Sequence, residues 1–182
     1  DKSWDENYGA KAARGGADIP LVVTEATEVK FYYDHKTHWV TDNVNSIIAV
    51  AIGDFQSELG CTNDNDPGCL RSWLQDPQGS GTYSLITNQL PAGSYTFQVA
   101  LDESDSEIYG ADGGLNGAPL SFTVEKDGDE IYLAYDPATH GIMISTEGAP
   151  RGIIQNELVR KSYLGQTFRG DEFDKPSKTW MG

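Results

Sequence analysis

An internal repeat is the feature of this sequence that most constrains its fold. Residues 1–23 align without a gap with residues 102–124, and nine of the 23 positions are identical. After one inserted residue the match resumes between residues 29–40 and residues 131–142. The identical pairs in the first stretch are Asp1/Asp102, Ser3/Ser104, Glu6/Glu107, Tyr8/Tyr109, Gly9/Gly110, Ala10/Ala111, Gly16/Gly117, Ala17/Ala118 and Val23/Val124. This similarity predicts two copies of one structural unit.

The two copies differ in what stands ahead of them. Residues 44–101, with several strand patterns, lead into the second copy, and no comparable stretch leads into the first. We therefore expect residues 1–42 to be the C-terminal half of a first repeat and residues 43–146 to be a complete module. Residues 147–182 would be a tail or linker that could act as an assembly arm.

The residue pattern predicts strands throughout the repeat. Val, Ile, Thr, Tyr and Phe alternate with polar residues, and turn sequences such as DPQGSG and KDGD separate the runs. The expected strands are 19–24, 28–33, 38–41, 47–52, 82–87, 93–101, 119–124, 129–135 and 141–145. The fold class is therefore all-β, with immunoglobulin-like β-sandwich repeats, one complete and one partial, and a C-terminal extension.

The strong negative charge narrows the range of partners. The formal net charge is −15, which argues against nucleic acid and anionic membrane surfaces. Neutral glycans and basic protein surfaces remain compatible with it. No apolar run is long enough to span a bilayer. Residues 147–182 carry six Lys/Arg and five Asp/Glu, so the other residues hold a charge of −16.

Two cysteines, Cys61 and Cys69, bracket the polar loop TNDNDPG. Their spacing favours a local disulfide and an oxidising, extracellular location, either secreted or at the cell surface. Two free thiols are the alternative. A metal site is less favoured, because no second Cys or His pair accompanies them.

Several long strings resemble one family. FQSELGC, CLRSWLQDPQGSGTY and LPAGSYTFQVAL are similar to the accessory β-sandwich module of bacterial pullulanases and amylopullulanases, and so are WDENYGAKAARGGADIPLVV and VKFYYDHKTHWVTD. The resemblance covers residues 1–146. It implies a carbohydrate-binding module, often in tandem, whose ligand is starch or pullulan. It also implies that catalysis lies in another domain, so we expect no enzyme activity here. More remotely, W-x-x-N-Y-G is similar to starch-binding domains of outer-surface lipoproteins of gut bacteria.

The candidate sugar-binding residues are aromatic side chains with nearby amides. Trp4, Asn7 and Tyr8 form one such set in the first copy. The alternative is a loop packed over the end of the sandwich with Tyr8 as its anchor. Because Tyr8 recurs as Tyr109 while Trp4 is replaced by Asp105, Tyr8 is the more structural of the two.

Two further tryptophans, Trp39 and Trp73, are candidates for carbohydrate binding. Trp73 lies between leucines near the cysteine loop, which favours packing over sugar contact. Trp39 lies on an alternating stretch, and Gly141 is its counterpart in the second copy. We expect Trp39 to be an exposed platform or an interface anchor.

No metal or cofactor is predicted. The loops 64–66 and 76–81 offer too few carboxylates for a convincing calcium site. His35 and His38 lack a third ligand, and a turn stabilised by Asp and Thr with a packing His is the simpler interpretation. No nucleophile-elbow, phosphate-loop or HExxH motif is present.

Two functions remain as hypotheses. The first is a non-catalytic, extracellular α-glucan-binding module of a secreted starch-degrading protein. The second is a subunit of an extracellular filament or surface layer, assembled by strand or tail exchange. The expected partners are α-glucan, and either other copies of this chain or the rest of a longer chain that completes residues 1–42.

Overall fold

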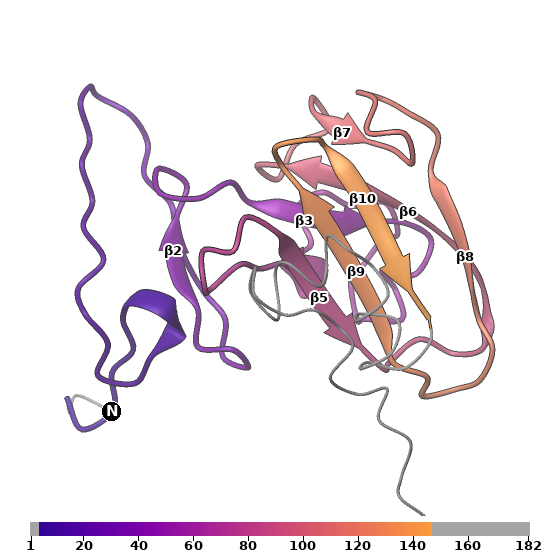
Figure 1. Ribbon diagram of the computed structural model, residues 1–182, viewed down its shortest axis with the longest axis horizontal. Coiled ribbons are helices and arrows are strands. Elements are labelled where there is room, and N and C mark those ends of the chain that lie inside the picture. The colour runs from indigo at the N-terminus through magenta and orange to yellow at the C-terminus, as the bar shows by residue number, and fades with distance from the viewer. Residues whose placement is uncertain (1–3, 147–182) are drawn as a thin grey trace, which may run out of the picture.

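Two packed β-sheets form the larger part of the molecule (Figure 1). The computed structural model describes residues 4–146. Between residues 43 and 146, which we call the sandwich, the elements are β3 (Ala49–Ile52), η2 (Leu70–Ser72), β4 (Trp73–Leu74), β5 (Tyr83–Thr87), β6 (Gly93–Leu101), β7 (Ile108–Tyr109), β8 (Leu120–Val124), β9 (Ile131–Asp136) and β10 (Gly141–Ser145). The prediction of an all-β sandwich is confirmed.

Strand β6 is the centre of the first sheet. It pairs antiparallel with β3 along one edge, and with β8 and then β7 along the other. β4 extends the sheet beyond β3. The second sheet has the order β10-β9-β5, again antiparallel. β9 lies between two partners, and all of its residues are buried.

The main core lies between these two sheets. Because successive side chains of a strand point to opposite faces, every second side chain faces the core, as Phe122 and Val124 of β8 show. The buried members of this core are Ala49, Ala51, Phe55, Leu59, Leu74, Leu90, Phe97, Val99, Leu101, Tyr109, Phe122, Val124, Ile131, Leu133, Tyr135 and Ile142. Cys61 and Cys69 form a disulfide that closes the loop beside it.

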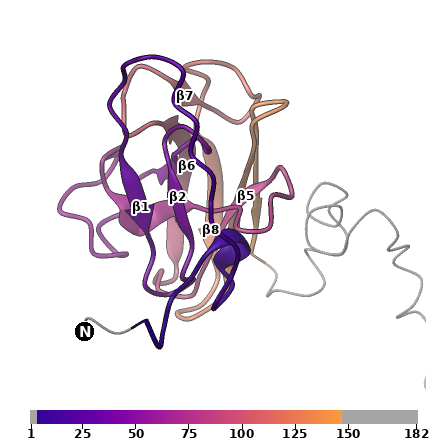
Figure 2. The ribbon, with the colours of Figure 1, turned by 90° about the vertical axis from the view of Figure 1, so that its left-hand side faces the viewer.

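Residues 4–42 form a smaller part, which we call the N-terminal segment. It contains a short turn, η1 (Ala10–Ala12), an extended run, and a hairpin of β1 (Phe31–Tyr33) and β2 (Val40–Asp42). Figure 2 shows the hairpin facing the viewer, in front of the sandwich.

The N-terminal segment repeats the local structure of residues 105–144. Tyr8 stacks on His38 with ring centroids 3.9 Å apart, and Tyr109 stacks on His140 at 4.0 Å, each pair with planes 4° apart. Each histidine Nδ1 also hydrogen-bonds the hydroxyl of the tyrosine five residues earlier, Tyr33 or Tyr135. The sequence repeat is therefore a structural repeat, in which β1 and β2 correspond to β9 and β10.

An aromatic cluster joins the N-terminal segment to the sandwich. Tyr32 and Trp39 from the segment pack with Ile48 and Trp73 from the sandwich. The rings of Trp39 and Trp73 are stacked with centroids 4.7 Å apart. At the rim, the Tyr32 hydroxyl donates a hydrogen bond of 2.7 Å to Glu103 Oε2.

The structure corrects one predicted strand. Residues 19–24 are not a strand, although their counterpart, β8, is one. β8 exists as a strand because it pairs with β6, and residues 19–24 have no such partner in the described part of the chain. The sequence pattern also missed β4 and β7, which have two residues each.

Candidate functional site

The most exposed aromatic side chain among the described large hydrophobic residues is that of Trp4, at 84%. It lies in a loop that local hydrogen bonds hold in shape. Asn7 Nδ2 donates to the Trp4 carbonyl oxygen at 3.1 Å, and Arg14 Nη2 donates to the Asp5 carbonyl oxygen at 3.1 Å. The Trp4 ring is thus exposed to solvent while its backbone is restrained.

A shallow cavity of about 370 Å³ adjoins Trp4. Asn7, Asp18 and Phe31 line it, together with Gly9 and Gly16. A volume of this size, with aromatic groups and a few polar ones, lies in the range of small-molecule sites. The structure therefore brings together two of the predicted residues, Trp4 and Asn7, and places Tyr8 at the same cavity.

Tyr8 has a structural role in addition. One face of its ring is covered by His38, and its hydroxyl donates a 2.8 Å hydrogen bond to Glu6 Oε1. That hydrogen bond to a carboxylate raises the pKa of the Tyr8 hydroxyl, with burial as a smaller cause. Tyr109 makes the same contacts with His140 and Glu107. Tyr8 thus joins the Trp4 loop, through Glu6, to the hairpin, through His38.

Trp39 is not an exposed platform. Only 6% of it is exposed, because it is stacked on Trp73 and buried between the hairpin and the sandwich. The expectation of an exposed ring was wrong, and the other expectation, an interface anchor, describes its position. Trp73 is also buried, as its leucine neighbours indicated.

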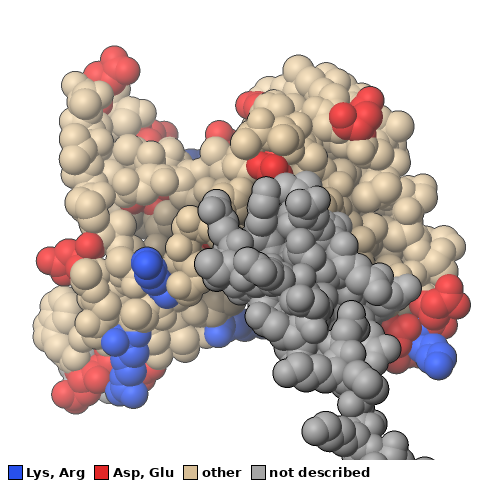
Figure 3. Space-filling view, viewed as in Figure 1, with Lys and Arg blue, Asp and Glu red and all other residues tan. Residues whose placement is uncertain are grey.

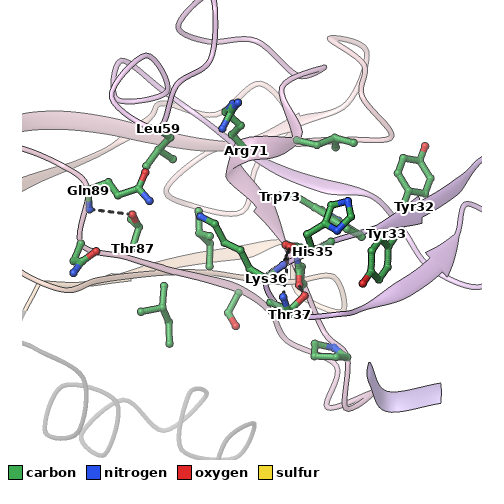
Figure 4. Close-up of a pocket in the computed structure, with 18 of the residues that line it drawn as sticks. Tyr32, Tyr33, His35, Lys36, Thr37, Leu59, Arg71, Trp73, Thr87 and Gln89 are labelled. Atoms are coloured by element: carbon green, nitrogen blue, oxygen red, sulfur yellow. Dashed lines mark hydrogen bonds between the residues drawn. The ribbon is translucent and has the colours of Figure 1, made fainter. Parts of the chain in front are cut away.

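A larger groove of about 910 Å³ separates the hairpin from β5 (Figure 4). Residues 31–37 line one side and residues 84–89 line the other, with Arg71 and Leu70 between them. The close-up shows Tyr33, His35 and Lys36 on the hairpin side, and Thr87 with Gln89 on the opposite side. This groove runs along the edge of β1 that faces away from β2.

Phe31 and Tyr33 are exposed aromatic residues that sequence reasoning did not single out. Phe31 is 70% exposed. The repeat held a usable signal, because their counterparts, Leu133 and Tyr135, are core residues. Phe31 and Tyr33 therefore occupy core positions of the repeat, and they are exposed because this face of the sheet is not covered. Trp4 occupies a position that is exposed in the second copy too, where the residue is Asp105. This difference separates Trp4 from the other exposed aromatic residues.

On the face of the molecule shown in Figure 3, the surface carboxylates do not gather at one site. Figure 3 shows acidic side chains at separate positions over the visible face. Within residues 4–146, no group of three or more His, Cys, Asp or Glu side chains could hold a metal ion. Asp76 instead accepts hydrogen bonds from the backbone N–H groups of Ser80 and Gly81, which makes loop 76–81 a turn.

No helix in the described part of the chain is both long and apolar enough to cross a membrane.

The fold and the exposed aromatic loop define a small all-β sandwich module built from a repeat. A family model described as the pullulanase X25 domain matches residues 48–142. The chain belongs to the pullulanase X25 domain family, an accessory domain of pullulanases.

The similar proteins are much longer than this chain. An amylopullulanase of Thermoanaerobacterium saccharolyticum is 31% identical over 160 residues, which is 85% of this chain and 12% of that protein. An amylopullulanase of Thermoanaerobacterium thermosulfurigenes is 29% identical over 160 residues, which is 85% of this chain and 8% of that protein. A solved structure, the pullulanase from Bacillus acidopullulyticus, matches with a TM-score of 0.47 and 32% identity, over 56% of this chain and 12% of that one.

Proposed function

We propose that this chain is an extracellular, non-catalytic module that binds α-glucan, such as starch or pullulan, through Trp4. The observation that carries the proposal is the 84% exposed indole beside a cavity with amide and carboxylate groups. Sugar rings present an apolar face of C–H groups and a rim of hydroxyls. Trp4 can stack on that face, and Asn7 and Asp18 lie near enough to the cavity to meet the hydroxyls.

Membership of the X25 family supports the ligand class. The similar proteins are named amylopullulanases, and this chain spans 12% or less of their length. A module of such an enzyme gains by holding the polysaccharide near the catalytic domain, because a tethered ligand has a raised effective concentration. The disulfide between Cys61 and Cys69 supports an oxidising compartment outside the cell.

Affinity electrophoresis in starch-containing gels tests the proposal. We expect the migration of the intact chain to be retarded by starch, and Trp4→Ala to lower the affinity roughly tenfold, which equals 1.4 kcal/mol. Asp105→Ala is the matched control, because Asp105 is the exposed counterpart of Trp4 in the second copy. It should migrate like the unaltered chain.

Two results would contradict the proposal. One is unchanged mobility of the intact, folded chain in starch. The other is equal retardation of the unaltered chain and Trp4→Ala, which would place binding elsewhere on the surface. Because Trp4 is exposed and its side chain makes no core contact, loss of folding should not obscure the comparison.

A further inference from the structure

The cavity beside Trp4 and the groove between the hairpin and β5 share one lining residue, Phe31. The cavity, at about 370 Å³, is near the lower limit of small-molecule sites, about 300 Å³. It can therefore hold only a short part of a polysaccharide chain. The groove is larger, at about 910 Å³. Phe31 is thus the point at which a chain bound beside Trp4 can pass from the cavity into the groove.

Position 31 differs between the two copies of the repeat. Phe31 corresponds to Leu133, a residue of the main core. An apolar position needs no aromatic ring, and yet the first copy has one there that is 70% exposed. Trp4 likewise stands where the second copy has a residue without a ring, Asp105. The two rings that only the first copy has line the same cavity.

Tyr33 continues the aromatic surface into the groove. Phe31 and Tyr33 are on the exposed face of β1, whereas Tyr32 between them is buried against the sandwich. Two residues of a strand span about 7 Å. The Tyr33 hydroxyl hydrogen-bonds His38 Nδ1 at 2.9 Å, and the His35 ring packs edge-on against the Tyr33 ring at 4.8 Å. The Tyr33 ring is therefore held in a fixed position beside the groove.

The groove also offers hydrogen-bond donors. Lys36 and Arg71 line it and are exposed, and within residues 4–146 neither forms an ion pair. Asn88 and Gln89 add exposed amide groups. In the close-up, the Lys36 side chain extends from the hairpin in the direction of Thr87 and Gln89 (Figure 4). Ammonium, guanidinium and amide N–H groups can all donate to the hydroxyl groups of a sugar.

On the basis of the glucan site proposed at Trp4, we propose that one unbranched run of α-glucan occupies both the cavity and the groove. Part of the run stacks on Trp4 and Phe31, and the next part lies past Tyr33, where Lys36 and Arg71 donate hydrogen bonds to its hydroxyl groups. A short sugar fills only the cavity. The site therefore selects long runs over short ones, and Phe31 and Arg71 determine that selectivity.

Calorimetric titration with maltotriose and maltoheptaose tests this proposal. The unaltered chain should bind one molecule of either sugar, and maltoheptaose at least about tenfold more tightly. A longer sugar also has more ways to occupy a short site, which raises its affinity without any new contact. Variants of the groove are therefore needed, because they change the contacts and leave the sugars the same.

Arg71→Ala should lower the affinity for maltoheptaose about fivefold, since it removes roughly one hydrogen bond. The affinity for maltotriose should stay the same, because Arg71 lines the groove and not the cavity. Lys126→Ala is the matched control, since it removes an exposed cation that lines neither. Equal affinities of the two variants for maltoheptaose would overturn the proposal.

Phe31→Leu gives position 31 the residue of the second copy and keeps it apolar. The loss of the ring should weaken maltoheptaose binding by about threefold or more. Val22→Ala is its control, because Val22 is 71% exposed on the same segment and lines neither the cavity nor the groove. Binding by Phe31→Leu that is as tight as binding by Val22→Ala would overturn the role of Phe31.

Two further results would overturn the continuous site. One is two molecules of maltoheptaose per chain, which would make the cavity and the groove separate sites. The other is equal affinity of the unaltered chain for the two sugars. If Trp4→Ala still weakens maltotriose binding in that case, the glucan site at Trp4 stands and only its extension is wrong. If Trp4→Ala binds both sugars as tightly as the unaltered chain, both proposals fail.

Discussion

At the scale of single residues, the differences between the two copies have a structural reason. Tyr32 corresponds to Ala134 and Trp39 to Gly141, and both aromatic residues lie in the cluster that joins the N-terminal segment to the sandwich. A change between copies was expected to reflect ligand chemistry. For these two positions it reflects a contact that only the first copy makes. Two exposed aromatic differences are left, namely Trp4 in place of Asp105 and Phe31 in place of Leu133.

Trp39→Ala should therefore loosen the N-terminal segment from the sandwich. Replacing a buried tryptophan leaves a cavity and costs about 3–5 kcal/mol. Urea unfolding combined with hydrogen exchange of β1 would measure the lost stability. The hairpin should unfold at a lower urea concentration than the sandwich. Trp4→Ala is the control and should change the free energy of unfolding by no more than about 0.5 kcal/mol. Equal stability of the two variants would contradict the burial of Trp39.

The Tyr32 hydroxyl predicts a dependence on high pH. Burial raises its pKa above the usual value of about 10, and the hydrogen bond to Glu103 adds to the rise. A raised pKa in the folded state means that the stabilisation is complete below about pH 10 and is lost as the pH rises through the higher value.

Tyr32→Phe should lower the stability of the hairpin by about 1 kcal/mol at pH 7, where it removes one hydrogen bond. Between pH 9 and pH 11, its urea midpoint should fall less steeply than that of the unaltered chain. The decline should not vanish, because the pKa of other tyrosines is raised as well, namely Tyr8, Tyr83, Tyr95, Tyr109 and Tyr135. If the urea midpoints of Tyr32→Phe and the unaltered chain fell equally with pH, ionisation of Tyr32 would not contribute to the loss of stability.

At the scale of elements, the sequence predicted strands where a partner strand exists. The expected strands 119–124 and 141–145 correspond closely to β8 and β10, because alternating side chains there face a covered core. Residues 19–24 have a similar pattern and are not a strand, since strand formation requires a neighbour that the local sequence does not specify. The site was less predictable, because the exposure of Trp4 and the burial of Trp39 depend on packing between distant segments.

The disulfide between Cys61 and Cys69 should stabilise the sandwich near η2. It closes a short loop with a sequence separation of 8, for which loop entropy gives about 2–3 kcal/mol. The double variant Cys61→Ser/Cys69→Ser should lose that amount in chemical denaturation. Reduction of the unaltered chain should produce the same loss, and an unchanged midpoint in both experiments would contradict the estimate.

At the scale of the whole molecule, a repeated unit explains both the ordered sandwich and the uncovered N-terminal face. The acidic surface disfavours anionic ligands and permits a neutral polysaccharide. Family membership defines the kind of enzyme in which such modules occur, and the exposed indole of Trp4 is the site that we propose for the glucan. The uncovered face adjoins that site, because Leu21 and Phe31 also line the cavity beside Trp4.

Calorimetric titration with a soluble maltooligosaccharide tests the central claim most directly. The intact chain should bind it at one site, Trp4→Ala should weaken binding roughly tenfold, and Asp105→Ala should bind like the unaltered chain. A folded chain that shows no binding, or a Trp4→Ala variant that binds as tightly as the unaltered chain, would contradict the account.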